Sequence, residues 1–256
     1  MVLEVADYAV WAPTLMLVIF RVAGIFITAP MLGSPTIPPV VKAMIAIVVG
    51  LAVTGRLAAP VAMPATWVAL VMGVGREMLV GATLGYAASL LFVGVNLAGG
   101  SISRQMGIGL AEVFNPQAQW ATDLVSTTLN LLALVIYLAI GGHRLLVEGL
   151  MSTFTTVPLM SFAAGADVLE IMLSLLTAAF ILGVKMAAPV LVTLMLASMA
   201  MGLIQRTMPQ FNILSAGFQI RVLVSLTILA ISLAALVPLI EIGWSLTMTA
   251  MGRLFP

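Results

Sequence analysis

Long apolar stretches alternate with short polar breaks along the whole chain. A helix that crosses a bilayer needs about 20 mostly apolar residues, and stretches near that length recur between breaks rich in proline, glycine and charge. They cover residues 8–32, 40–55, 67–99, 124–141, 145–156, 168–203 and 222–240. We therefore expect an all-α, multi-span membrane protein with about six apolar helices, some of them broken or hairpin-like.

One apolar stretch is too long for a single simple span. Residues 168–203 are interrupted by Pro189, and proline removes a backbone donor and clashes with the preceding turn. We expect a kink or a hairpin at Pro189.

Composition places the chain among integral membrane proteins. Hydrophobic residues make up 62% of it and charged residues 7%, whereas a soluble domain carries about 25% charged residues. The net charge of +1 gives no case for nucleic acid as a partner. There are no cysteines, which excludes disulfides and thiolate chemistry. No Lys or Arg precedes the first apolar stretch, so we expect that stretch to be retained rather than cleaved as a signal peptide.

The most polar break covers residues 99–123. It combines charged, amide and glycine residues with apolar ones such as Met106 and Phe114. Its glycines and the Asn115-Pro116 step argue against one continuous helix. We interpret it as a semi-ordered loop that lies against protein or inside a cavity. A plain connecting loop is the alternative.

A few charged residues lie inside apolar stretches. A charge at the bilayer centre costs on the order of 2.5–3.5 kcal/mol on insertion scales, so Arg21 needs a partner or a polar cavity. It either makes a subunit contact or lines a pathway, or it snorkels or forms an internal pair. Arg76 and Glu77 are adjacent and point about 100° apart on a helix, so each needs a partner on another helix or chain. Gly81 and Gly85 form a G-x-x-x-G pattern that permits close helix packing.

The chain lacks recognisable catalytic and metal-binding motifs. His143 is the only histidine and follows two glycines, a position typical of a helix end rather than of a metal ligand. There is no G-x-S-x-G, Walker or paired-carboxylate motif. We expect no enzyme, no metal and no cofactor.

Short motifs occur in a fixed order over nearly the whole chain. The motifs are Phe20-Arg21-x-x-Gly24-x-Phe26, Ala29-Pro30, Ile37-Pro38, Lys42, Arg76-Glu77-Met78-Leu79-Val80-Gly81, Ala98-Gly99, Gln105-Met106-Gly107, Asn115-Pro116, Gly142-His143, Ala188-Pro189, Arg206 and Pro209-Gln210-x-Asn212. Their order and spacing together resemble the FliR family, the export-gate component of the flagellar type III secretion apparatus.

The resemblance implies a single FliR-like domain over residues 1–256, similar to a fusion of two smaller subunits. Residues 1–167 would be FliP-like and residues 168–256 FliQ-like. It implies assembly with FliP-like and FliQ-like subunits and work with FlhA-like and FlhB-like components. The complex would pass unfolded flagellar proteins through a pore at the bacterial inner membrane, in the flagellar basal body.

The resemblance also assigns roles to residues. The central loop, residues 104–123, would plug the closed pore, and isolated charges and a polar hairpin tip would serve subunit contacts or lie within the membrane. The expected plug residues are Arg104, Gln105, Met106, Gly107, Ile108, Gly109, Leu110, Glu112, Phe114, Asn115 and Pro116. The expected interface or intramembrane residues are Arg21, Arg76, Glu77, Lys185, Arg206, Pro209, Gln210 and Asn212.

Two other functions stay open at this point. A virulence-type secretion system uses a close homologue, the SctT protein, as its own export-gate subunit. A secondary transporter would account for charges such as Arg21, Glu77 and Lys185 and for proline breaks near a substrate site.

Overall fold

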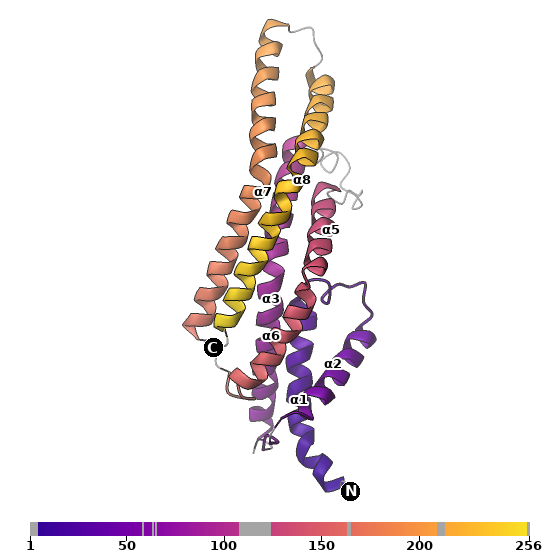
Figure 1. The fold of residues 1–256 in the computed structure, drawn as a ribbon, viewed down its shortest axis with the longest axis vertical. Helices are drawn as coiled ribbons and strands as arrows, with labels where there is room; N and C mark the ends of the chain where they lie inside the picture. Colours follow the sequence, from indigo (N-terminus) through magenta and orange to yellow (C-terminus); the bar gives the residue numbers. More distant parts are fainter. Residues whose placement is uncertain are drawn as a thin grey trace. The chain divides into compact units, whose positions relative to one another are not determined.

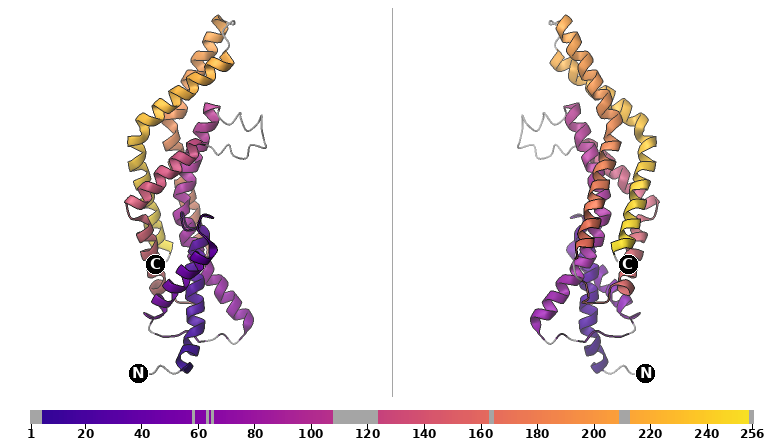
Figure 2. Two further views of the ribbon diagram at one scale, coloured as in Figure 1. Left: turned by 90° about the vertical axis from the view of Figure 1, so that its right-hand side faces the viewer. Right: turned by 90° about the vertical axis from the view of Figure 1, so that its left-hand side faces the viewer.

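The computed structural model describes residues 5–57, 59–62, 64, 66–107, 124–162, 165–208 and 213–254. Over these residues the secondary structure is entirely α-helical, as Figure 1 and Figure 2 show, and no strand occurs. The prediction of an all-α protein is confirmed. The helices are α1 (Val5–Thr28), α2 (Pro39–Thr54), α3 (Trp67–Met106), α5 (Leu124–Ala139), α6 (Gly142–Thr156), α7 (Ala166–Thr207) and α8 (Ile213–Leu254).

Four of the described helices, α1, α3, α7 and α8, are long and apolar enough to cross a membrane. The number rises to five if α5 and α6, which a break at Gly141 separates, form one span. About six apolar helices were expected; seven helices are described, and four or five of them qualify as spans. Helix α2 is not among them, because its 16 residues extend about 24 Å, short of the roughly 30 Å hydrocarbon core.

Helix α7 corrects the expectation of a hairpin at Pro189. The helix runs unbroken from Ala166 to Thr207 with Pro189 inside it. Buried side chains continue at four-residue intervals on both sides of the proline, at Met186, Val190 and Leu194. Packing along this stripe keeps the helix continuous, because buried neighbours compensate for one missing backbone hydrogen bond.

Helix α3 also continues further than its sequence suggested. The apolar stretch was expected to end at Gly99, yet the helix ends at Met106. Ala98, Ile102 and Met106 are each no more than 1% exposed and are spaced by four residues, which places them on one face. The first part of the expected loop is therefore the last turns of a packed helix.

The described residues divide into two compact units. The first contains residues 1–90, 141–175 and 246–256, and the second contains residues 91–140 and 176–245. The FliP-like and FliQ-like parts expected from the family resemblance follow a different boundary, at residue 167, and stay a prediction.

In the first unit, glycines allow the backbones of α1 and α3 to touch. A Cβ atom added at Gly81 would collide with the carbonyl oxygen of Arg21, and one at Gly85 with Thr28. On the facing helix, a Cβ atom at Gly24 would collide with the carbonyl oxygen of Met78. The close packing predicted from the G-x-x-x-G pattern is confirmed.

In the second unit, glycine again allows two helix backbones to touch, and an aromatic cluster is also present. A Cβ atom at Gly94 would lie 2.5 Å from the carbonyl oxygen of Ala179, so α3 and α7 also meet at backbone level. Tyr137 packs edge-to-face against Phe92 and Trp244, with ring centroids 5.7 and 4.9 Å apart. These contacts join α3, α5 and α8 within this unit.

Substitution of Gly81 tests the close contact of α1 with α3. We expect Gly81→Ala to lower the melting temperature of the purified protein in detergent, because overpacking costs about 1–3 kcal/mol. Gly75→Ala is the matched control, since it lies on the same helix and no heavy atom lies within 4 Å of an added Cβ. Alanine there should raise stability by about 0.5–1 kcal/mol. Equal melting temperatures for the two variants would contradict the contact.

Candidate functional site

A buried ion pair joins α1 to α3 in the first unit. Arg21 Nε donates to Glu77 Oε2 over 2.5 Å, and both side chains are 0% exposed. The two residues come from helices whose backbones already touch at Gly24 and Gly81. The close approach of the helices is what allows both charges to lie in the interface away from water.

The remaining contacts of Arg21 lie at the C-terminal end of α6. Arg21 Nη1 donates to the carbonyl oxygens of Thr153 and Val157 over 2.8 and 3.1 Å. Carbonyl groups at a helix C-terminus carry partial negative charge; the oxygen of Thr153 also accepts the N–H of Val157. The guanidinium carbon also lies 4.7 Å from the ring centre of Phe154, within cation–π range. Arg21 therefore caps α6 while it pairs with Glu77.

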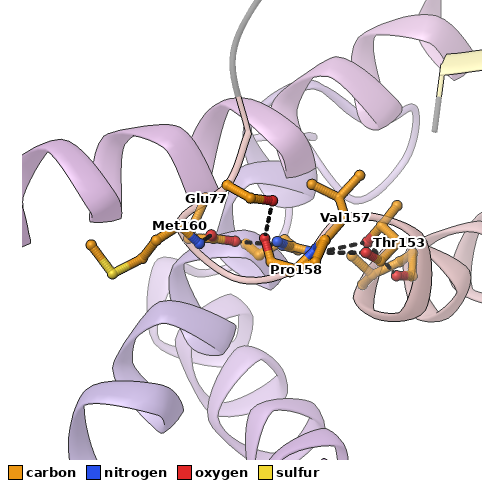
Figure 3. A network of polar contacts seen from close by, with 8 residues as sticks. Glu77, Thr153, Val157, Pro158 and Met160 are labelled. Carbon is orange, nitrogen blue, oxygen red and sulfur yellow. Dashed lines mark hydrogen bonds and ion pairs between the residues drawn. The ribbon is translucent and has the colours of Figure 1, made fainter. Parts of the chain in front are cut away.

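Glu77 and Arg76 together hold the backbone of Met160 in the connection between α6 and α7. Glu77 Oε1 accepts a hydrogen bond from Met160 N over 2.7 Å, and Arg76 Nη1 donates to Met160 O over 3.3 Å. Met160 has φ 68°, a left-handed conformation that non-glycine residues adopt rarely. Figure 3 shows Glu77, Thr153, Val157 and Met160 gathered around this network.

The network answers the sequence-based expectations for three charged residues. Arg76 and Glu77 each find a partner elsewhere in the chain, as their positions on the helix predicted: both contact the backbone of Met160, and Glu77 also pairs with Arg21. Arg21 lies in an internal pair, one of the alternatives left open for it. A role of these residues at a subunit interface stays a prediction.

Physically, the network joins three segments of the first unit, with Arg21 and Glu77 buried and Arg76 exposed. Breaking a buried ion pair costs about 3–5 kcal/mol, since the remaining charge is left without a partner. Among the described residues, no cluster of three His, Cys, Asp or Glu side chains could hold a metal ion. What the arrangement does is to hold α1, α3 and the α6–α7 connection together.

Of the expected plug residues, the structure describes the first four. Arg104 and Gln105 are exposed in the last turn of α3, and Met106 is 1% exposed. Gly107 follows with φ 87° and donates its N–H to Arg104 O, a left-handed ending typical of helices. The loop therefore begins after Met106, not at Arg104. Ile108, Gly109, Leu110, Glu112, Phe114, Asn115 and Pro116 lie outside the described residues.

The other expected sites lie elsewhere along the chain. Lys185 and Arg206 are exposed on α7, both in the second unit. Pro209, Gln210 and Asn212 lie outside the described residues. His143 is exposed in the first turn of α6, which confirms that it marks a helix end.

Sequence reasoning missed the partners of the ion pair and a second polar contact. Nothing in the sequence around Thr153, Val157 or Met160 indicates that their backbone groups receive a buried charge. Asn96 and Asn130 are different, because each is an amide inside an apolar stretch. The rule that directed attention to Arg21, that a polar side chain among apolar residues needs a partner, could have found this pair.

Comparison with known proteins places these features in a wider group. Residues 12–246 match the family of bacterial export proteins, family 1. The chain is 27% identical to flagellar biosynthetic protein FliR of Bacillus subtilis over 94% of each chain. It is 30% identical to FliR of Aquifex aeolicus over 91% of this chain and 88% of that protein. It is 28% identical to FliR of Escherichia coli over 87% of this chain and 83% of that protein.

A double-mutant cycle tests the buried pair. We expect Arg21→Met and Glu77→Met each to destabilise the protein by about 3–5 kcal/mol, because each leaves one buried charge unpaired. The double variant should be destabilised much less than the sum of the two single changes. Denaturant titration in mixed micelles measures all three variants.

The control is an exposed pair in the same unit, Arg144 and Glu148, whose Nε and Oε1 atoms lie 2.7 Å apart. Exposed pairs contribute little to stability, so Arg144→Met and Glu148→Met should leave unfolding almost unchanged. Additive effects at Arg21 and Glu77 would show that the buried pair is not coupled.

Proposed function

The chain belongs to the FliR family of bacterial export proteins, and on that premise we propose that it is a non-enzymatic core subunit of the flagellar type III protein export gate. The observation that carries the proposal is the family match over residues 12–246. The multi-span helical fold supports it. The relatives above are flagellar proteins, which favours the flagellar apparatus over a virulence-type system.

In this proposal the chain forms part of a pore for unfolded flagellar proteins. It assembles in the bacterial inner membrane with FliP-like and FliQ-like subunits and works with FlhA-like and FlhB-like components. Large apolar side chains on α7 and α8 need a cover of lipid or protein, and their exposure supports assembly with such subunits. Examples are Leu196, Leu203, Leu223 and Ile231, which are 62, 67, 66 and 71% exposed.

The central loop closes the idle pore in this account. A protein-conducting pore must hold back ions and yet yield to a passing chain. Ile108, Leu110 and Phe114 supply apolar side chains that suit a dry constriction, and Gly107 ends the preceding helix in a left-handed turn. Opening then displaces a loop while the helices remain in place, which is a common division in switching proteins.

The buried network supports the proposal that the helices stay in place while the loop moves. Arg21 and Glu77 join segments of the first unit through contacts that exclude water. The same network weakens the secondary-transporter alternative, because Arg21 and Glu77 are paired with each other and with the backbone and have little capacity to bind a solute. Lys185, the third charge that suggested a transporter, is exposed on α7.

Deletion of residues 107–111 tests the plug. We expect the deletion to raise ion leak through the assembled complex, because the apolar seal is lost, while assembly stays normal. Membrane conductance measures the leak, and the amount of purified complex measures assembly. A second variant replaces the same five residues by serine, which keeps the length and removes the apolar side chains; it should leak as well. Wild-type conductance in an assembled deletion complex would overturn the plug.

A further inference from the structure

Two asparagines form a polar bridge between α3 and α5 in the second unit. Asn130 Nδ2 donates to Asn96 Oδ1 over 2.5 Å and to the carbonyl oxygen of Ser126 over 2.9 Å. Asn96 Nδ2 donates to the carbonyl oxygen of Phe92 over 3.1 Å. Both amides are therefore oriented by their own helices and joined to each other across the interface. Amides in membrane helices commonly connect neighbouring helices in this way.

A backbone contact lies about one helical turn beyond the amides. A Cβ atom at Gly99 would collide with Ser126 Cα and lie 2.7 Å from Ser126 Oγ. Ser126 Oγ in turn lies 3.5 Å from the carbonyl oxygen of Asn96. The absence of a side chain at Gly99 brings the two helices close enough for the amides to meet.

These contacts are close to both ends of the central loop. Helix α3 ends at Met106 and α5 begins at Leu124, so Ser126 belongs to the first turn of α5. Figure 1 shows α5 beside the C-terminal part of α3. The distal turns of α3 are themselves packed, since Ile102 and Met106 are each 1% exposed. Gly107 follows the end of the helix with φ 87°.

We propose that Asn96 and Asn130 are positioning residues for the central loop, and that the stem they form with Gly99 and Ser126 stays closed while a substrate passes. The stem keeps Gly107 and Leu124, the residues on either side of the loop, at a fixed spacing. The inference rests on the proposed gating function, and it adds which residues set the position of the gate and which part of it does not move.

Removal of one amide tests the positioning role. We expect Asn96→Leu and Asn130→Leu to raise ion leak through the assembled complex by roughly three- to twenty-fold, the factor that corresponds to loss of one interhelical hydrogen bond. Thr128→Val is the matched control, because Thr128 Oγ1 donates only to Leu124 O of its own helix among the described contacts. The amount of complex should be normal in all three variants. Wild-type leak in assembled Asn96→Leu and Asn130→Leu complexes would overturn the positioning role.

Cross-linking tests whether the stem stays closed. The natural chain has no cysteine, so an Asn96→Cys, Asn130→Cys double variant carries only the two intended thiols on this subunit. A short, reducible thiol cross-linker should lower the leak of this variant and leave export of a flagellar substrate at the uncross-linked rate. Single-cysteine variants treated alike are the control. Export that stops on cross-linking and returns on reduction would show that the stem must open.

The outcomes separate the inference from the function on which it rests. If deletion of residues 107–111 raises ion leak and the asparagine variants leak no more than the wild type, the positioning role of the stem is wrong and the plug proposal is retained. If the deletion complex assembles and remains tight, the plug is wrong, and the positioning role is overturned with it.

Discussion

An ion pair without access to water depends on its surroundings for every contact, and three separate segments supply the contacts of Arg21 and Glu77. Arg21 Nη2 is buried and has no hydrogen-bond partner among the described residues. Only 7% of the residues in this chain are charged, and two of them are buried between helices. Desolvation makes the pair a weak source of net stability, but it makes any arrangement that separates the charges costly. The pair therefore selects one mutual placement of α1, α3 and the α6–α7 connection.

That placement of the helices is possible only because glycines let their backbones come into contact. Between helices in lipid there is little hydrophobic driving force, so association depends on close packing and on interhelical hydrogen bonds. Gly24 and Gly81 bring the backbones of α1 and α3 into contact, and Arg21 and Glu77 pair beside them. Gly99 does the same for α3 and α5, where Asn96 and Asn130 pair. In both units the polar bridge forms where a missing side chain lets the helices approach.

Apolar periodicity was enough to predict the helices, and the need for a partner at Arg21 followed from the cost of an unpaired charge. The identity of the partner did not follow, because Glu77 lies far away in sequence and local patterns carry no information about which helices meet. The hairpin at Pro189 and the helix end at Gly99 were wrongly expected because both residues are helix breakers by local propensity, whereas buried stripes such as Met186–Val190–Leu194 and Ala98–Ile102–Met106 hold the helices continuous. A kink at Pro189 stays a prediction. The backbone groups of Met160 and Thr153 could not be predicted, since every residue offers the same ones.

A buried ion pair joins helices in the first unit and a more exposed amide pair joins helices in the second. In the proposed gate these helices stay in place, and a short loop closes a pore shared with other subunits. The central claim of this account is that the chain works only as part of an export gate. The most direct measurement is purification of a tagged copy from its native membrane, followed by native mass spectrometry. The account predicts one copy of this chain with several copies of two smaller hydrophobic subunits. A lone monomer or a homodimer that binds a small solute would contradict it.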